Sequence, residues 1–177
     1  SRCRQDVRPP AASDVIAMEA AQDQVVGVGM QPKVTLVIIC WNHAAFVEAA
    51  VRSAVHQTYG NTELIVFDND SKDGSPEIIQ KLADEFGFQF YRQENIGLVR
   101  TLNRALGMAT GKYFSQLAAD DHWYLDKTER QVAYMEAHPD VHIVCGGMDP
   151  VDEHDRPTDF KVGSWPGEVT FESLMTE

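Results

Sequence analysis

Apolar and polar stretches alternate along the chain after residue 32, and they predict strands and helices in regular succession. Short β-branched runs such as VTLVII are typical of the buried strands of a parallel sheet. Apolar residues at helical spacing follow each run, as in amphipathic helices that cover such a sheet. The pattern predicts strands over 34–39, 63–67, 88–92, 113–117 and 141–147, and helices over 46–55, 75–86, 98–109 and 125–138.

This succession predicts an α/β fold with a mostly parallel sheet and helices on both of its faces. Strand–helix–strand units join parallel strands by right-handed crossovers, which place the helices on the sheet. Residues 1–32 have no sustained period and contain Pro9 and Pro10. We therefore expect a flexible N-terminal extension over 1–32 and a single α/β domain over 33–177.

Polar residues follow four of the predicted strands. In open parallel sheets, ligands bind at the carboxyl ends of the strands. That rule selects a set of segments as the expected ligand-binding edge, and three of the four contain carboxylates. The segments are Cys40–His43, Asp68–Asp70, Gln93–Asn95 and Ala119–Asp121.

The charge and the cysteines limit the classes of partner and the compartment. The formal net charge of −12 argues against nucleic acid or an anionic membrane as the main partner, because both attract clustered Lys and Arg. Cys3, Cys40 and Cys145 are far apart, as expected of reduced thiols in the cytosol. No apolar run approaches the roughly 18 residues of a membrane span. We expect a cytoplasmic protein.

The adjacent carboxylates Asp120 and Asp121 have two interpretations. Two neighbouring carboxylates at a strand end repel each other, and a divalent cation such as Mg²⁺ or Mn²⁺ removes that repulsion. Mg²⁺ commonly sits between one or two carboxylates and the phosphates of a substrate. The alternative is a solvated turn in which Asp120 or Asp121 caps the helix beginning near Asp126, and for the pair alone this turn is the favoured interpretation.

Other polar segments are also ambiguous when considered singly. The segment DNDSKDGS, residues 68–75, consists of turn-forming residues and fits a strand-to-helix loop. Trp41 suits a core position or a stacking contact with a base.

A phosphoreceiver-like α/β domain would also have an acidic pocket, but no lysine after a late strand completes such a pocket here.

The four motifs occur in order along the chain, and together they resemble the family 2 glycosyltransferases. The motifs are VIICWNH, DNDSKDGS, ENIGLVRTLNRALGMATGKY and LAADD, and the resemblance covers about Lys33 to Pro157. Members of that family are inverting enzymes with a GT-A (Rossmann-like) fold that use nucleotide-diphospho-sugars. The resemblance implies a hexosyltransferase of cell-envelope polysaccharide biosynthesis, of which this chain is the donor-binding portion.

The resemblance also implies roles for individual residues. The end of the first strand contacts the nucleobase in such enzymes, with Trp41 where the family usually has Tyr. Asn69 stands where the family often has a second Asp. The segment LAADD occupies the position of the family's DxD element and has Ala118 at the first acidic position. The implied nucleotide-sugar-binding residues are Ile39, Trp41, Asn42, Asp68, Asn69, Asn95, Arg100 and Asp120, and the implied ligands of Mn²⁺ or Mg²⁺ are Asp121 and Asp120.

The general base of an inverting transferase is missing from these motifs. In the family it is an acidic residue well downstream of the DxD element, and we expect it beyond Glu177. The domain would then be truncated before its acceptor-binding half. Two functions stay open: transfer to a saccharide, lipid-linked or protein acceptor, and a non-catalytic nucleotide-sugar-binding module. Location at the inner face of the membrane and a homo-oligomer are compatible with both.

Overall fold

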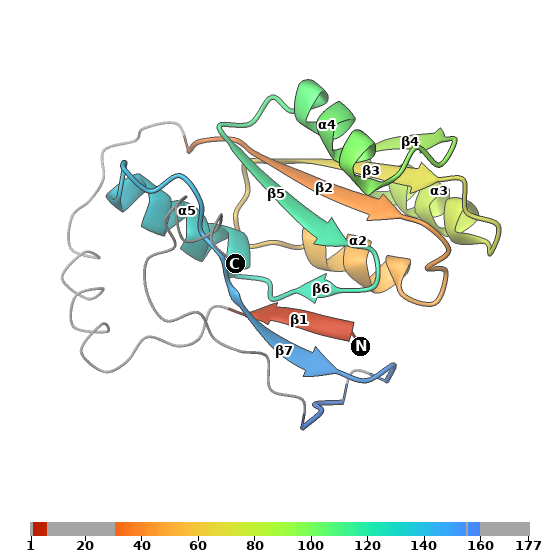
Figure 1. Cartoon of the computed structure of the whole chain (residues 1–177). Coiled ribbons are helices and arrows are strands. Elements are labelled where there is room, and N and C mark those ends of the chain that lie inside the picture. Colours follow the sequence, from red (N-terminus) through yellow and green to blue (C-terminus); the bar gives the residue numbers. More distant parts are fainter. Residues whose placement is uncertain (1, 7–30, 155, 160–177) are drawn as a thin grey trace, which may run out of the picture.

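A four-stranded parallel sheet forms the centre of the described part of the chain (Figure 1). In the computed structural model, the described residues are 2–6, 31–154 and 156–159, with the backbone alone for 2–6. The strand order is β4-β3-β2-β5, and every neighbouring pair is parallel. The strands are β2 (Val34–Cys40), β3 (Thr62–Asn69), β4 (Gln89–Gln93) and β5 (Tyr113–Ala118).

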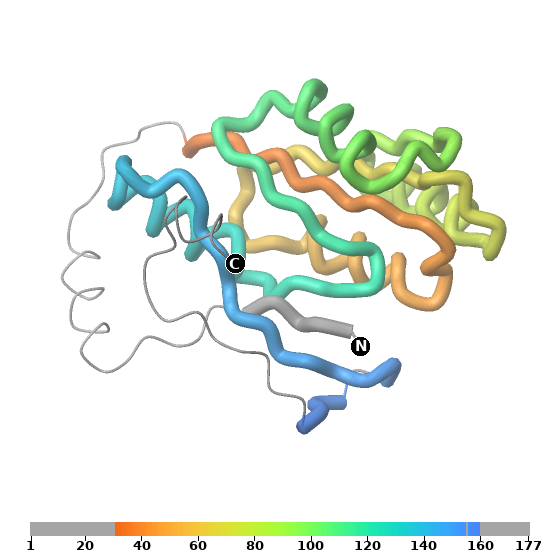
Figure 2. Tube along the Cα trace, in the orientation of Figure 1, coloured from red at the N-terminus to blue at the C-terminus, as the bar shows by residue number. Residues whose placement is uncertain are grey.

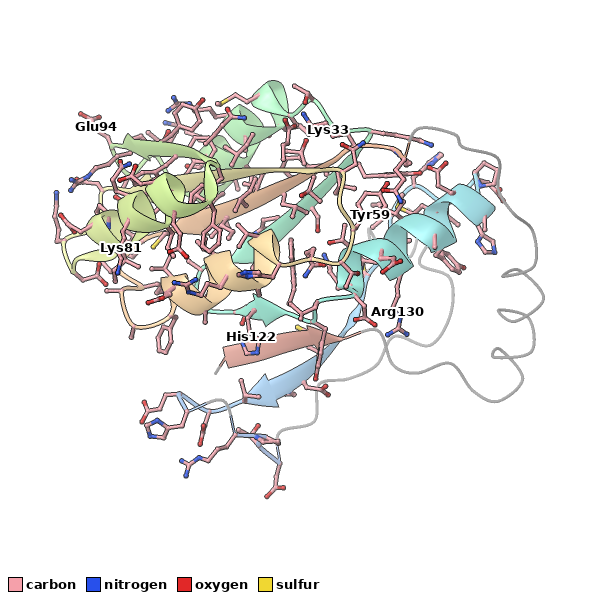
Figure 3. The ribbon with its side chains drawn as sticks, turned by 180° about the vertical axis from the view of Figure 1, so that it is seen from behind. Lys33, Tyr59, Lys81, Glu94, His122 and Arg130 are labelled. Carbon is pink, nitrogen blue, oxygen red and sulfur yellow. The ribbon has the colours of Figure 1, made fainter. Side chains whose placement is uncertain are left out.

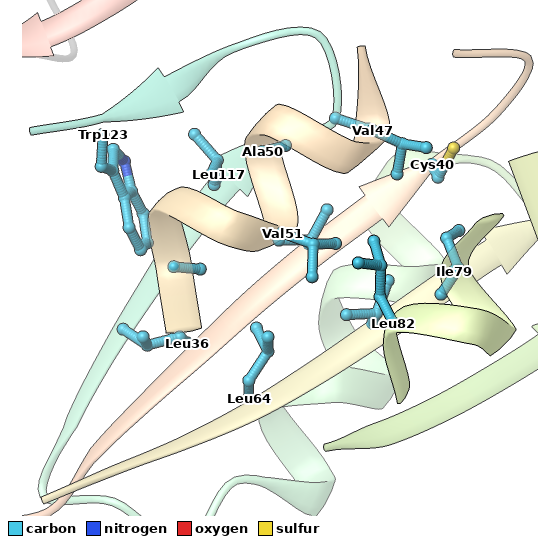
Figure 4. Packing of buried hydrophobic residues seen from close by; sticks show 14 of the residues in the cluster. Leu36, Cys40, Val47, Ala50, Val51, Leu64, Ile79, Leu82, Leu117 and Trp123 are labelled. Carbon is cyan, nitrogen blue, oxygen red and sulfur yellow. The ribbon is translucent and has the colours of Figure 1, made fainter. Parts of the chain in front are cut away.

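Helices cover both faces of this sheet, as the sequence predicts. Successive residues of a strand point to opposite faces, so Leu36 and Ile38 pack on one side and Val37 and Ile39 on the other. The first face packs against α2 (Val47–Val55) and α3 (Ser75–Phe86) (Figure 4). The second face packs against α4 (Leu98–Met108) through Ala105. The predicted α/β fold class is confirmed.

A second, smaller sheet lies beside the central one (Figures 1 and 2). Strand β1 (Arg2–Asp6) pairs in parallel with β6 (His122–Trp123) and antiparallel with β7 (Gly147–Val151). Residues 2–6, which belong to the expected extension, are therefore a strand, whereas residues 7–30 lie outside the described part. Helix α5 (Lys127–Ala137) connects β6 to the segment that leads into β7.

The prediction of a strand over residues 141–147 is wrong. Residues 141–146 form no strand, although they include Val141, Ile143 and Val144. The strand begins at Gly147 instead, where β1 supplies a partner from the other end of the chain. Pairing with a distant segment has outweighed the β-branched composition of the neighbouring run.

The amino-terminal edge of the central sheet is held by a polar network around Glu63. Its Oε1 accepts hydrogen bonds from Thr35 Oγ1 at 2.5 Å and from the Thr110 amide at 2.7 Å. Its Oε2 lies 2.8 Å from Lys33 Nζ and accepts from Thr110 Oγ1 at 2.8 Å. Burial alone would raise the pKa of Glu63, but these bonds outweigh it and lower the pKa to about 2. Gly111 packs against the same network, and its amide donates to Thr35 Oγ1.

Candidate functional site

The strand register brings the predicted site residues to one edge of the central sheet. Cys40 pairs with Asp68, and Ile39 pairs with Ala118, so the ends of β2, β3 and β5 lie level with one another. Figure 3 labels Lys33, which precedes β2, and Glu94, which follows β4, at opposite edges of the sheet. The carboxyl edge is the one where parallel sheets bind ligands.

Asp68 is the most deeply buried carboxylate at this edge. It is 0% exposed, and its Oδ2 accepts a hydrogen bond from the Ser71 amide at 3.1 Å. Arg92, on the neighbouring strand, places its Nε 3.7 Å from the same oxygen. The other oxygen, Oδ1, has no hydrogen-bond partner among the described residues. A buried carboxylate oxygen left open in this way is a ready acceptor for a ligand N–H.

The loops after β2 and β3 are joined to each other by hydrogen bonds. The Asn42 amide donates to Ser71 Oγ at 2.8 Å, and Asn42 Oδ1 accepts from the Lys72 amide at 2.8 Å. Asn42 and Asp70 have φ angles of 57° and 63°, in the left-handed region that Asn and Asp tolerate better than most residues. The two loops therefore form a single unit with two constrained backbone positions.

Asp73 completes this unit. Its Oδ2 accepts from the Ala44 amide at 2.8 Å, and its Oδ1 accepts from the Ser75 hydroxyl at 2.6 Å. Ser75 Oγ in turn accepts from the His43 amide at 3.1 Å. Burial tends to raise the pKa of Asp73, but the bonds from Ser75 and Ala44 outweigh it and lower the pKa. The DNDSKDGS segment is thus a loop, and several of its polar groups serve to fix the loop beside it.

Asn69 and Ile39 lie on the opposite face of the sheet from Asp68. Asn69 is buried, and its amide nitrogen donates to Thr101 Oγ1 of α4 at 3.0 Å. Its Oδ1 accepts from Gln93 Nε2 at 2.8 Å. Ile39 packs in the apolar cluster against α4. The structure therefore places these two predicted nucleotide-binding residues on the α4 face.

Three other predicted binding residues are exposed at the carboxyl edge. Trp41 follows β2 directly and is 56% exposed, so its ring is not part of the core. Asn95 lies in the loop before α4, and its Oδ1 accepts from the Gly97 amide at 3.0 Å. Arg100 is in the first turn of α4 and is exposed. An exposed tryptophan at a ligand edge is available for stacking.

The Asp120–Asp121 pair lies in a tight turn after β5, where the Asp121 amide donates to the Ala118 carbonyl at 3.2 Å. The Asp120 side chain is 40% exposed, and its Oδ1 lies 4.0 Å from His43 Nδ1. Among the described residues, no three His, Cys, Asp or Glu side chains gather as a metal-binding group. Two partly exposed carboxylates suit a Mg²⁺ or Mn²⁺ ion whose remaining ligands are phosphate oxygens and water.

Sequence reasoning missed the buried ring nitrogen of His43 and the position of Arg92 beside Asp68. His43 Nδ1 has no hydrogen-bond partner in the described part of the chain, although the atom is buried. The one signal in the sequence is its place directly after Asn42, in a segment already assigned to the ligand edge. Arg92 lies between Tyr91 and Gln93 in β4, and only the register reveals that it pairs with Asp68.

Comparison with known proteins gives a family match over most of the chain. The family model described as Glycosyl transferase family 2 matches residues 35–165. An uncharacterized glycosyltransferase of Rickettsia prowazekii is 35% identical over 117 residues, which cover 65% of this chain and 36% of that protein. The UDP-Glc:α-D-GlcNAc-diphosphoundecaprenol β-1,3-glucosyltransferase WfaP of Escherichia coli is 34% identical over 103 residues, or 58% of this chain and 41% of that protein.

A solved structure shows the same arrangement of strands and helices. The mannosyltransferase PcManGT of Pyrobaculum calidifontis, in complex with GDP-Man and Mn²⁺, has a TM-score of 0.57 and 27% identity to this chain. The similarity covers 63% of this chain and 34% of that protein. The chain thus spans less than half the length of these relatives.

Proposed function

The chain belongs to glycosyl transferase family 2 and has a GT-A fold, and we propose that it forms the donor-binding part of a glycosyltransferase. The proposed reaction transfers a hexose from a nucleotide-diphospho-sugar to an acceptor hydroxyl, with inversion at the anomeric carbon. The proposal rests mainly on one observation. Trp41, Asp68 and the Asp120–Asp121 pair all lie at the carboxyl edge of the same sheet. The likeness to an enzyme bound to GDP-Man and Mn²⁺ supports it.

We propose that Trp41 and Asp68 hold the nucleobase. The exposed ring of Trp41 would stack on the base, while Asp68 Oδ1 would accept a hydrogen bond from a base N–H. Asn42 fixes the loop that bears Trp41, so its contribution is to orient the stacking surface. Asn95 and Arg100 would line the side of the nucleotide next to α4. Asn69, buried against Thr101, would act by holding α4 in place.

The Asp120–Asp121 turn would hold Mn²⁺ or Mg²⁺ against the donor diphosphate, with Asp121 as a direct ligand and Asp120 shared between metal and ribose. A divalent cation in that place would neutralise the negative charge that develops on the leaving nucleotide. The turn presents both carboxylates at the end of β5, level with Ile39. His43 Nδ1 lies 4.0 Å from Asp120 Oδ1 and would help to orient that carboxylate.

For the acceptor we propose a saccharide, with a lipid-linked saccharide as the first to test. WfaP is named for a diphosphoundecaprenol-linked sugar, and it is 34% identical to this chain. Among the described residues, no helix has the length and apolar character required to cross a bilayer. A cytoplasmic protein at the inner face of the membrane would meet such an acceptor. The general base would come from a part of the enzyme other than the motifs described above.

Calorimetric titration with UDP, GDP and dTDP, each with and without Mn²⁺, tests the donor site. We expect Mn²⁺-dependent binding of one nucleotide, and loss of that dependence in Asp121→Ala. Asp140→Ala, an exposed aspartate in the loop after α5, is the matched control and should bind like the wild type. Absence of binding by a folded wild-type chain, or equal binding by Asp121→Ala, would contradict the proposal.

Turnover separates the transferase from a binding module. A protein that joins this chain to an acceptor-binding half is incubated with the sugar derivative of the nucleotide that binds, and release of the free nucleotide is followed. Binding without release, in a protein that also includes the remaining acceptor half, would favour a non-catalytic nucleotide-sugar-binding module. Release of free nucleotide that requires both Mn²⁺ and Asp121 would support the transferase function.

A further inference from the structure

Helix α2 links two parts of the proposed donor site. At its beginning, the Val47 amide donates to the His43 carbonyl at 2.9 Å, in the loop that bears Trp41. Along its length, α2 contacts β6, the short strand that follows the Asp120–Asp121 turn (Figure 1). One helix therefore supports both the loop proposed to hold the nucleobase and the turn proposed to hold the metal ion.

The chain is buried against this helix on both sides of the Asp120–Asp121 pair. Ala119 and Trp123 are buried, and both belong to the apolar cluster that includes Ala50 and Ala54 of α2. Figure 4 shows Trp123 beside that helix. The two aspartates between these anchors are only partly buried. The turn thus presents its carboxylates from a packed base.

Ser53 is a polar anchor between α2 and the chain after the turn. Its Oγ accepts a hydrogen bond from the Trp123 amide at 3.1 Å, and its hydroxyl donates to the Ala50 carbonyl at 2.8 Å. The bond to Ala50 uses the hydroxyl hydrogen, which leaves the oxygen to accept from Trp123. The position of the Trp123 backbone is therefore tied to one side chain of α2.

Gln57, which follows α2, holds the chain just beyond Trp123. Its Nε2 donates to the Tyr124 carbonyl and to the Ser53 carbonyl, each at 2.9 Å. Its Oε1 accepts from the Thr128 amide at 2.9 Å. The residue is buried, and both its N–H groups and its carbonyl oxygen are bonded. A buried amide with all of these bonds made fixes the segments that it joins.

Lys127 fixes the ring of Trp123 from α5. The residue is only 5% exposed, and its Nζ lies 3.7 Å from the centre of the Trp123 ring. The same atom donates to Ser115 Oγ of β5 at 2.7 Å. A cation over an indole face is attracted to it, most strongly where water is excluded. Trp123 therefore has a backbone anchor on α2 and a ring anchor on α5.

We propose that Ser53 and Gln57 are positioning residues of the donor site, which hold the Asp120–Asp121 turn in a fixed place relative to the loop that bears Trp41. This inference rests on the proposed function, because it concerns the metal and nucleotide of that site. The base and the diphosphate are parts of one molecule, so a nucleotide can use both subsites only if their separation is kept. A turn that is held before binding loses less conformational freedom when the metal and diphosphate arrive.

Calorimetric titration with UDP, GDP and dTDP, each with and without Mn²⁺, tests the role toward the metal. In Ser53→Ala the ratio of the two affinities should fall by about tenfold, at the lower end of the roughly 10- to 100-fold typical of contacts that orient metal ligands. The affinity without Mn²⁺ should change by less than about twofold, because the loop after β2 keeps its own bonds. A merely structural role would reduce the fraction of active protein and leave the ratio unchanged. An unchanged ratio in the folded variant overturns the proposal.

A second variant and a control complete this test. Gln57→Leu removes different bonds to the same segment and should also lower the ratio, so it decides the matter if Ser53→Ala does not fold. Val55→Ala is the matched control, because it removes apolar atoms from the same helix and no hydrogen bond to residues 123–128. Its ratio should equal that of the wild type. An equal fall in Val55→Ala would show an effect of helix packing alone and overturn the proposal.

Hydrogen exchange in the absence of ligand separates this inference from the proposed function. In Ser53→Ala the amides of Asp121 and Trp123 should exchange about tenfold faster, whereas the Asn42 amide, bonded to the other loop, should not change. Unchanged exchange of the Asp121 amide would overturn the positioning itself. A wild type without Mn²⁺-dependent binding would instead overturn the proposed function, and the role toward the metal with it.

Discussion

The two edges of the central sheet contain similar polar residues, and they differ in how many of those groups have partners. At the amino edge, both oxygens of Glu63 accept hydrogen bonds, from Lys33, Thr35 and Thr110. At the carboxyl edge, Asp68 Oδ1 and His43 Nδ1 have no hydrogen-bond partner among the described residues. The polar groups at the amino edge stabilise the fold, whereas some of those at the carboxyl edge remain available to bind a ligand.

The backbone shows the same difference. Asn42 and Asp70 hold left-handed conformations at the carboxyl edge, and such conformations cost of order 1–3 kcal/mol each. At the amino edge the chain instead packs so closely that only a glycine fits at position 111. The presence of polar residues does not by itself separate the two edges, because both contain carboxylate and amide side chains. Unsatisfied groups and strained residues do separate them, and they support the carboxyl edge as the candidate site.

The largest expected effect comes from breaking the amino edge. In Gly111→Ala, the added methyl carbon would lie 2.6 Å from the Thr35 amide nitrogen and 2.8 Å from the Lys33 carbonyl. Because both are backbone atoms, we expect a loss of about 3 kcal/mol in the free energy of unfolding, measured by urea denaturation. Gly107→Ala in α4, which meets no atom within 4 Å, is the control. It should gain about 0.5–1 kcal/mol, and equal losses in both variants would refute the packing argument.

Acid should weaken the amino edge through Glu63. Its pKa is lowered to about 2 in the folded state, so the unfolded chain takes up the proton first as the pH falls. The stabilisation is fully present above about pH 5 and is lost towards pH 2, with a size on the order of 2 kcal/mol. The measurement is the free energy of unfolding of wild type minus Glu63→Gln across that range. A difference that does not shrink with acid would contradict the assignment.

At the carboxyl edge, Asp68→Asn should affect binding more than folding. The amide keeps the shape of the side chain and can still accept from Ser71, but it loses the negative charge. We expect nucleotide affinity to fall by about tenfold, since hydrogen bonds to charged groups contribute about 1.5–3 kcal/mol. Calorimetry measures the affinity, and urea denaturation checks that stability changes less. Asp70→Asn removes a nearby charge at a residue that asparagine also suits, and it should bind normally.

The smallest expected effect is that of Trp41→Ala. The side chain is 56% exposed, so the free energy of unfolding should stay within about 0.5 kcal/mol of the wild type. Nucleotide affinity should fall by about fivefold, which corresponds to the lower end of the roughly 1–3 kcal/mol that base–aromatic stacking contributes. Calorimetric titration gives the affinity. An unchanged affinity would exclude Trp41 from the donor site, and a large loss of stability would show that the ring is part of the core.

The sequence predicted the central sheet well because its signals are local. The β-branched runs and the helical stripes mark β2 to β5 and α2 to α5 to within a few residues. Gly87 ends α3 in the left-handed conformation, as a glycine after an apolar stripe indicates. The small sheet escaped prediction, because β7 contains Gly147 and Pro150 and depends on β1, which lies at the other end of the chain.

The candidate site was predictable in position but not in detail. Strand ends could be located, and so could Asp68, Trp41 and the Asp120–Asp121 pair. The strand predicted over 63–67 continues to Asn69 in the structure. Asp68 and Asn69 are therefore successive strand residues and lie on opposite faces of the sheet. The burial of Lys127 had no signal at all, since a lysine at the start of a helix is normally exposed.

The bonds between the loops after β2 and β3 set a rule for redesigning the chain. Asn42 bonds to Ser71 and Lys72, and Ala44 bonds to Asp73. A chimaera that takes one loop from a relative and keeps the other would separate donors from acceptors that have to match. Residues 41–75 should therefore be exchanged between homologues as one cassette, with crossover points before Trp41 and after Ser75.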